Sequence, residues 1–263
     1  MTVALSLTQQ GLAVLSGVAV GFSLGLLGGG GSILAVPLLL YLVGYPNAHV
    51  VIGTTALAVG VTAYLNLLPH WRAGNVQWGP ALVFAVPGVL GAAAGSTLGK
   101  IVPGKHLLFL FALLMLVVAG FMLRRRPDTD QPRRQQFMRW GRLLPSGFGV
   151  GLLAGFFGIG GGFLIVPGLL FATGMSMLQA IGTSLFSVGT FGITTAASYA
   201  LSGLLDWRVA AEYIVGGFAG GLLGAALATR LGRHKSALTR IFAGVIVVVA
   251  AYMLYVNAGV LRG

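Results

Sequence analysis

The stretch GLLGGGGSILAVP at residues 25–37 decides the fold, because a second copy, GFFGIGGGFLIVP, stands at residues 155–167. Its glycines and its proline return at an offset of about 130 residues: Gly25, Gly28, Gly30, Gly31 and Pro37 match Gly155, Gly158, Gly160, Gly161 and Pro167. The match continues downstream, where Ile52, Gly53, Thr54, Gly74 and Trp78 correspond to Ile181, Gly182, Thr183, Gly203 and Trp207. We therefore predict two internal repeats, at residues 11–123 and 143–257.

Each copy is a glycine cluster followed by an apolar segment, at 32–44 or 162–174, that is too short to cross a bilayer comfortably. Paired, glycine-interrupted segments in two repeats are typical of secondary transporters. Backbone that leaves the helix inside a bilayer must face protein or water, because lipid offers it no hydrogen bonds. We expect two broken helices whose glycine clusters meet near the middle of the membrane and line a cavity.

The composition assigns the whole chain to the membrane. Of its 263 residues, 57% are hydrophobic and 8% are charged, whereas a soluble domain carries about 25% charged residues. A soluble enzyme is therefore not expected, and the absence of cysteine excludes disulfides and cysteine catalysis. Apolar segments follow one another through a single membrane transport domain, 1–263, at about 11–27, 32–44, 49–69, 79–99, 105–123, 143–157, 162–174, 177–202, 208–230 and 237–257.

This pattern predicts an all-α polytopic membrane protein with about eight to ten membrane segments. We expect it to be an integral, multi-pass protein of a bacterial or archaeal cell (inner) membrane. The net charge of +12 would suggest nucleic acid in a soluble protein. Here it reflects loops rich in Lys and Arg, so the expected partners are the lipid bilayer and a small anion, with no nucleic acid.

The orientation follows from one charged link. Nine of the twenty charges lie within residues 124–142, which the positive-inside rule places in the cytoplasm. An odd number of five segments per repeat then turns the second repeat upside down, so that the basic stretch 230–240 is also cytoplasmic and both termini are external. If each broken pair were one spanning helix, the repeats would be parallel and 230–240 external. We favour the inverted arrangement.

The candidate site is built for an anion. Cation transport usually uses carboxylates embedded in the membrane, and only Glu212 of the four acidic residues falls inside a predicted span. Helix N-termini, by contrast, present free N–H groups and a positive dipole end, and the short segments begin near Ser32 and Gly162. Hydroxyls one helix later, at Thr54, Thr55, Thr183 and Ser184, could donate to an oxyanion. Their alternative role is hydrogen bonding to helix carbonyls.

Other residues have structural interpretations. Glycines four apart, such as Gly91, Gly95 and Gly99, let helices approach closely in lipid; the same spacing recurs at Gly147, Gly151, Gly155, Gly216, Gly220 and Gly224. We expect Gly95→Ala to be milder than Gly30→Leu or Gly160→Leu, which would abolish transport. The histidines His49, His70 and His106 lie near helix ends, where interfacial anchoring is favoured over proton coupling.

The chain resembles the TauE/SafE sulfite exporter family of membrane permeases. The resemblance rests on the twin glycine motifs, each followed by GTT or GTS, then by a spaced glycine and tryptophan and a glycine ladder, and it covers nearly the whole chain. It implies a non-enzymatic exporter of small sulfur-containing anions such as sulfite, sulfoacetate or related organosulfonates, without a cofactor or metal. The implied substrate-binding residues are Gly28, Gly29, Gly30, Gly31, Ser32, Thr54, Thr55, Gly158, Gly160, Gly161, Gly162, Thr183 and Ser184.

Several alternatives stay open at this level. An anion channel would share the site without alternating access, and a permease of the same fold could carry a different small anion. An intramembrane enzyme is disfavoured because no G-x-S-x-G or H-E-x-x-H motif occurs. A non-transporting assembly factor is a further alternative. A homo-oligomer is compatible with the sequence, which indicates neither the driving force nor the coupling ion.

Overall fold

The described part of the chain consists of helices joined by short loops. The computed structural model describes residues 5–124, 140–158, 162–230 and 235–257, and no strand occurs among them. The helices are α1 (Leu7–Leu27), η1 (Gly28–Leu34), α2 (Ala35–Pro37), η2 (Leu38–Leu42), α3 (Ala48–Arg72), α4 (Trp78–Ile101), α5 (Gly104–Arg124), α6 (Trp140–Phe157), α7 (Gly162–Thr173), α8 (Met177–Ala200), α9 (Trp207–Arg230) and α10 (Lys235–Asn257). Every predicted apolar segment therefore corresponds to a helical stretch, and the all-α prediction is confirmed.

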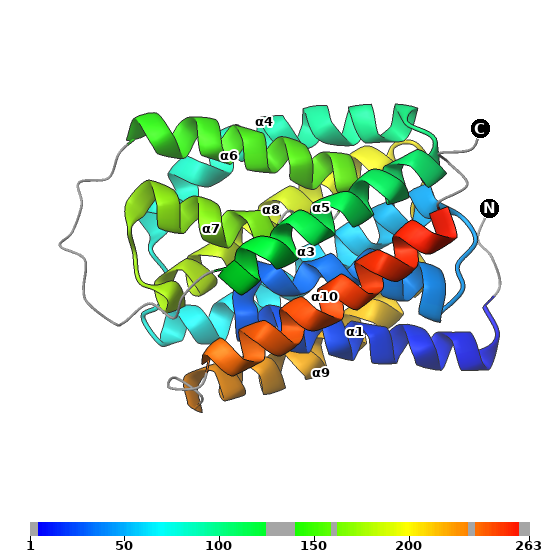
Figure 1. The fold of residues 1–263 in the computed structure, drawn as a ribbon, viewed down its shortest axis with the longest axis horizontal. Coiled ribbons are helices and arrows are strands. Elements are labelled where there is room, and N and C mark those ends of the chain that lie inside the picture. Colours follow the sequence, from blue (N-terminus) through cyan, green and yellow to red (C-terminus); the bar gives the residue numbers. More distant parts are fainter. Residues whose placement is uncertain (1–4, 125–139, 159–161, 231–234, 258–263) are drawn as a thin grey trace.

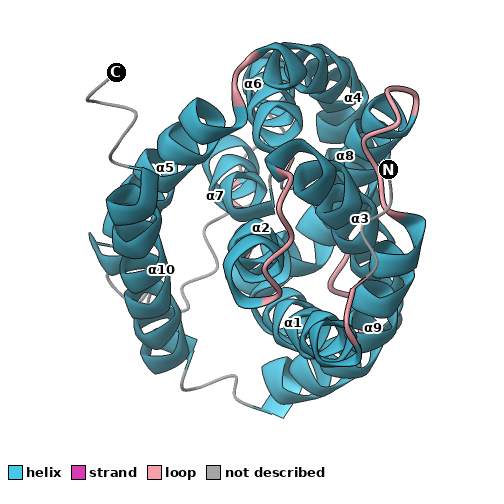
Figure 2. Cartoon of the chain, turned by 90° about the vertical axis from the view of Figure 1, so that its right-hand side faces the viewer, coloured by secondary structure: helices cyan, strands magenta, loops and turns pink. Residues whose placement is uncertain are grey.

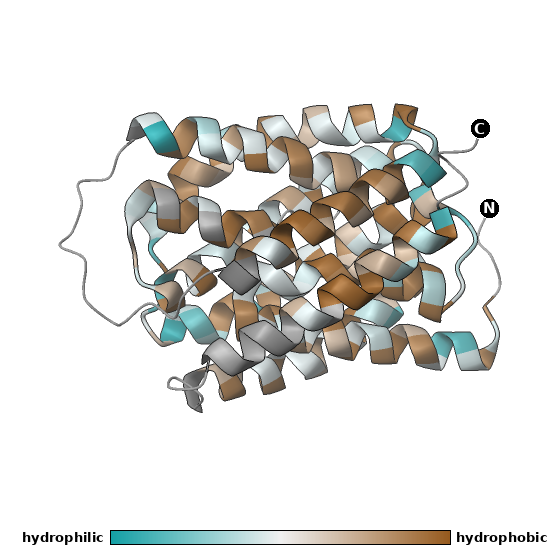
Figure 3. Ribbon diagram, in the orientation of Figure 1, coloured by the Kyte–Doolittle hydropathy of each residue, from teal (hydrophilic) through white to brown (hydrophobic). Residues whose placement is uncertain are grey.

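Six helical stretches among the described residues are long and apolar enough to cross a membrane. One of them, Leu7–Leu42, runs through α1 and the broken segment without an intervening loop. Polar residues gather at the two ends of the long axis and apolar residues fill the middle (Figure 3). The protein is therefore a multi-pass integral membrane protein.

The helices surround the broken segments. Seen along the long axis, α5 and α10 stand together on one flank, α3 and α8 occupy the opposite side, and α2 and α7 lie between these pairs (Figure 2). The remaining helices close the bundle as two packed pairs, α1 with α9 and α4 with α6. The broken segments are thus held inside the protein, which is where non-helical backbone is tolerated in a membrane.

The contacts have the pattern that two related halves would produce. In the predicted repeats, α1, α3, α4 and α5 correspond to α6, α8, α9 and α10. Exchanging the halves turns the α1–α9 contact into the α6–α4 contact, while α3–α8 and α5–α10 join equivalent helices. In Figure 1, α1 begins on the right and α6 begins on the left, so these two helices run in opposite directions. This geometry agrees with the inverted arrangement, although the duplication itself stays an inference from the sequence.

The helix ends also agree with the predicted orientation. The end of α5, the start of α6 and the start of α10 lie on the left in Figure 1, whereas α1 begins and α10 ends on the right. The helix ends that flank the two basic stretches therefore share one side, and the outer ends of α1 and α10 share the other. Most of the link 124–142 lies outside the described residues.

Glycine ladders set the helix pairs, as the spacing predicted. A Cβ built on Gly95 of α4 would overlap Leu152 O and lie 2.8 Å from Phe156 N of α6. The other eight glycines with this spacing meet the partner helix backbone in the same way: Gly91, Gly99, Gly147, Gly151, Gly155, Gly216, Gly220 and Gly224. A methyl group at Gly95 has no room between the two backbones, so Gly95→Ala perturbs the helix packing. That it impairs transport less than Gly30→Leu or Gly160→Leu stays a prediction.

Candidate functional site

The first helix break occurs at Gly28. α1 ends there, because Gly28 has φ +67°, a left-handed conformation that a residue with a side chain adopts only with strain. A Cβ at this position would also lie 2.9 Å from Ser184 Oγ and 3.0 Å from Ile181 Cα. The chain then resumes as the 3₁₀ helix η1 and continues through α2 into the π-helical η2. The new N-terminus thus lies at Gly28, four residues before the predicted position at Ser32.

The two halves of the chain meet at this break. The Gly29 N–H donates to Ser184 Oγ at 3.2 Å, and Ser184 Oγ donates to Ile181 O at 2.8 Å. Ser32 Oγ donates to Gly29 O at 2.9 Å. All the residues of η1 are buried, including Gly30 and Gly31. A predicted glycine cluster and a predicted hydroxyl are thereby brought into direct contact, although they are 155 residues apart.

The second break has the same geometry where it is described. Gly158 has φ +69° and follows the end of α6. A Cβ on Gly158 would overlap the side chain of Ile52, just as one on Gly28 would crowd Ile181. α7 begins at Gly162 and contacts η1. Gly160 and Gly161 lie outside the described residues, so the contact between the two short segments is described only where α7 packs on η1.

Thr54 and Thr183 play equivalent parts. Thr54 Oγ1 accepts the N–H of Asp206, which precedes α9, and Thr183 Oγ1 accepts the N–H of Gln77, which precedes α4, both at 3.0 Å. Each hydroxyl therefore ties α3 or α8 to the start of a helix in the other half. Both side chains are buried.

Thr55 makes a different bond. Its Oγ1 donates to Val51 O at 2.8 Å, the hydrogen bond to its own helix that was the alternative role of these hydroxyls. Ser184, its counterpart in the second half, also donates to its own helix, at Ile181 O, and in addition accepts the Gly29 N–H of the glycine break. The two halves thus differ at this pair of positions, because Ser184 bonds to the break of the other half and Thr55 bonds within α3.

A buried carboxylate was missed at the sequence level. Asp206, expected only at a helix end, is 2% exposed and caps α9, accepting the N–H groups of Arg208 and Val209. Its Oδ2 also accepts the hydroxyl of Tyr45, at 2.9 Å, from the loop that follows η2. An aspartate directly before an apolar helix is an N-cap signal, but the tyrosine 161 positions away has no local signature.

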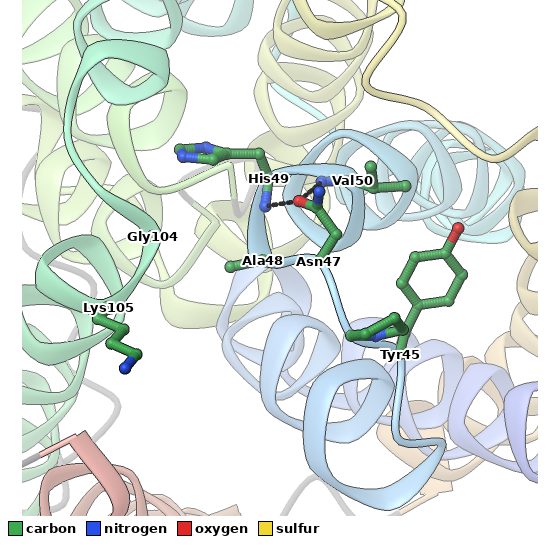
Figure 4. A pocket seen from close by; sticks show the side chains of 8 residues that line it. Tyr45, Asn47, Ala48, His49, Val50, Gly104 and Lys105 are labelled. Atoms are coloured by element: carbon green, nitrogen blue, oxygen red, sulfur yellow. Dashed lines mark hydrogen bonds between the residues drawn. The ribbon is translucent and has the colours of Figure 1, made fainter. Parts of the chain in front are cut away.

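A cavity of about 560 Å³ opens between the start of α3 and the start of α5. Asn47, His49 and Lys105 border it (Figure 4). Asn47 is committed to capping α3, since its Oδ1 accepts the N–H groups of His49 and Val50. None of the predicted site residues lines this cavity, which lies at the end of the bundle where α10 ends.

Metal ligands are not clustered in the part of the chain that the structure describes, where no group of three or more His, Asp or Glu side chains could hold an ion. The site consists instead of backbone N–H groups, glycines and hydroxyls. Such neutral donors can bind an anion through hydrogen bonds and a helix dipole.

Comparison with known proteins gives consistent matches. Residues 13–253 match the family model described as sulfite exporter TauE/SafE. A probable membrane transporter protein of Xylella fastidiosa (strain 9a5c) is 49% identical over 253 residues, which is 95% of this chain and 97% of that protein. The probable membrane transporter protein YdhB of Bacillus subtilis (strain 168) is 27% identical over 221 residues, 81% of this chain and 88% of that protein. No solved structure matches the chain significantly.

Proposed function

The chain belongs to the sulfite exporter TauE/SafE family of membrane transporters, and from this premise we propose that it exports small sulfur-containing oxyanions. The substrate class comprises sulfite, sulfoacetate and related organosulfonates. The substrate would bind at the first glycine break, with the second break completing the site. The observation that carries the proposal is the bond between the Gly29 N–H and Ser184 Oγ, at the start of a helical segment in the protein interior.

The chemistry of this break suits an oxyanion. The first N–H groups of a helix have no partner within it, and its N-terminus carries the equivalent of about half a positive charge. Ser184 Oγ now occupies the place beside Gly29 N–H that an anion oxygen would take, and the released hydroxyl could then bond to the same anion. Because these donors are neutral, they would bind the anion moderately, which permits release on the far side.

A cation has few ligands near this break. Two acidic residues, Asp206 and Glu212, fall within the described residues, and both lie in or just before the first two turns of α9. Asp206 is engaged by Tyr45 and by α9, and Glu212 pairs with Arg208 at 3.4 Å. The membrane potential assists an anion exporter, since exit from a cell that is negative inside is favoured by about 2.3 kcal/mol per charge per 100 mV.

The test is flux into liposomes that contain the purified protein. We expect radiolabelled sulfite and sulfoacetate to enter faster than in protein-free liposomes, while sodium and potassium do not. Counterflow, in which unlabelled substrate inside accelerates uptake of label, would identify a carrier, and its absence would indicate a channel. Flux of sodium or potassium without any oxyanion flux would overturn the proposal.

A pair of variants then locates the site. Ser184→Ala removes the hydroxyl that contacts the break, and we expect it to raise the apparent KM for the anion. Ser96→Ala is the matched control, because Ser96 is also buried but donates only to Ala93 O of its own helix. Equal effects of the two substitutions, at equal amounts of folded protein, would argue against substrate binding at the break.

A further inference from the structure

His70 is placed where a proton could control the first glycine break. It lies in the last turn of α3 and is 2% exposed, so it is not the interfacial anchor that the sequence favoured. Its Nε2 lies 3.1 Å from the carbonyl oxygen of Gly25, near the end of α1. A carbonyl oxygen can only accept a hydrogen bond, and Nε2 must therefore carry a proton in this contact.

This contact involves the hydrogen bond that the break interrupts. In a continuous α-helix the Gly29 N–H would donate to Gly25 O, four residues earlier. Here the Gly29 N–H donates to Ser184 Oγ, and Gly25 O is contacted by His70 Nε2. The two ends of one interrupted helical bond are thus held by side chains of α3 and α8. In the second half the Gly158 N–H, the counterpart of the Gly28 N–H, donates to Gly155 O at 3.3 Å, and the counterpart of Gly29 lies outside the described residues.

A polar stripe leads to His70 along α3. Asn66, one turn earlier, is 1% exposed, and its Nδ2 donates to Gly21 O at 3.4 Å. A Cβ on Gly221 of α9 would overlap the Asn66 side chain, so this glycine makes room for it. Buried polar side chains in a membrane are costly and mark functional paths. Asn66 therefore bonds α3 to α1 one turn before His70 does.

Among the described residues of α1, α3 and α9, His70 is the titratable side chain with a hydrogen bond to the backbone of α1. α1 contains no ionisable side chain. On α9, which packs on both α1 and α3, Arg208, Glu212 and Tyr213 lie in the first two turns and Arg230 at the last position, whereas Gly25 packs against Gly221 and Ala225. On α3 itself, His49 is at the opposite end, Tyr64 bonds to Thr190 of α8, and Arg72 is exposed.

We propose that His70 is a proton-binding site whose protonation favours binding of the anion at the first glycine break. This inference rests on the proposed transport function. The added proton binds Nδ1 of His70, since Nε2 already carries one, and the imidazolium donates a stronger, charge-assisted bond to Gly25 O. It also places a positive charge at the C-terminal end of α1, which the helix dipole favours.

The consequence for the anion is direct. His70 competes with the Gly29 N–H for Gly25 O, so a stronger His70 bond disfavours the return of that N–H, which stays available to Ser184 or to the anion. When His70 is neutral its bond is weaker, and re-formation of the Gly29–Gly25 bond withdraws a donor from the site. Proton and anion binding therefore strengthen each other, and the linkage is reciprocal. Histidine suits this role because it changes charge between about pH 5 and 8.

The experiment measures uptake of radiolabelled methanesulfonate by liposomes containing the full-length protein, with equal pH on both sides. A sulfonate stays ionised across this pH range, so a pH effect belongs to the protein. We expect the apparent KM of the wild type to fall at least about fivefold from pH 8 to pH 6, as expected for a histidine that becomes protonated in this range. His70→Gln keeps an N–H donor but cannot become charged, and its KM should change less than about twofold.

Controls separate this proposal from the transport function. His106→Gln, at an exposed position of α5, should keep the wild-type pH profile. ¹⁵N NMR of the labelled imidazoles needs no substrate, and the resonance that disappears in His70→Gln should titrate between about pH 5 and 8. A wild-type pH profile in His70→Gln, or a His70 that stays neutral at pH 5, overturns the proton site. Absence of sulfonate uptake in the wild type at every pH instead contradicts the proposed function.

Discussion

The α4–α6 contact allows a stringent test with two glycines on one helix. A Cβ on Gly151 of α6 would overlap the carbonyl oxygen of Gly88 on α4 and lie 2.6 Å from its Cα. Gly149, two residues earlier, is exposed and has no described atom within 4 Å of its built Cβ. We predict that Gly151→Ala destabilises the protein, whereas Gly149→Ala does not.

The magnitude follows from this geometry. Carbon atoms pack at about 3.5–4.0 Å, so α4 and α6 must separate by about 1 Å to admit the methyl group. Overpacking of this kind costs about 1–3 kcal/mol. Replacing glycine by alanine also favours the helix by about 1 kcal/mol, but this gain applies to both positions and cancels in the comparison. The two variants should therefore differ by about 1–3 kcal/mol.

Thermal unfolding of the purified variants in one detergent measures the difference. For a chain of this size, 1 kcal/mol corresponds to a shift of about 2–4 °C in the midpoint. We expect Gly151→Ala to unfold about 2–12 °C below Gly149→Ala, when both are heated at the same rate. Gly95→Ala, on the α4 side of the same contact, should resemble Gly151→Ala. Equal midpoints for all three variants would refute the close backbone contact.

Three further outcomes are expected. Thr183→Val leaves the Gln77 N–H without its acceptor and should lower stability by about 1–3 kcal/mol, whereas Thr183→Ser should not; equal unfolding midpoints would contradict the bond. Tyr45→Phe removes one donor from the Asp206 carboxylate and should destabilise by about 1.5–3 kcal/mol in the same assay, and an unchanged midpoint would show that this bond adds nothing. A single cysteine at Ala258 should react with a membrane-impermeant reagent from outside the cell; labelling only from the cytoplasm would exclude the inverted arrangement.

The helices were predictable because their signal is local. Apolar length alone marked every segment, and the glycine clusters marked where α1 and α6 end. The exact position of the helix break was harder to predict from the sequence. Of the four glycines at 28–31, only Gly28 has a positive φ, and the next three continue in η1. Four identical residues in sequence offer no means of choosing which one turns the chain, because the choice depends on Ser184 and Ile181 of the other half.

The candidate site was predictable as a set of residues but not as a network. The equivalent positions of Thr54 and Thr183 in the two repeats marked them as candidates. Their roles as hydrogen-bond acceptors depend on Asp206 and Gln77, each of which lies in the opposite half and comes close only in the folded structure. The burial of His70 was missed for a related reason. Its position near a helix end suggested the membrane interface, whereas the glycines of α9 draw α1 and α3 together around it.

The differences between the halves matter most for direction. Where the halves coincide, equivalent residues make the same interaction in each half. Gly28 and Gly158 each end a helix, and Thr54 and Thr183 each accept a hydrogen bond from a residue just before a helix of the other half. If the halves are related by inversion, such features are the same on both sides of the membrane and cannot distinguish export from import.

Directional or coupled transport then has to arise from positions at which the two halves carry different residues. Ser184 faces the break where Thr55 bonds its own helix, and His70 holds Gly25 where the second half places Tyr199 in the equivalent position of α8. Substituting these unmatched residues should therefore alter coupling and pH dependence, whereas substituting the matched ones should alter folding and turnover together.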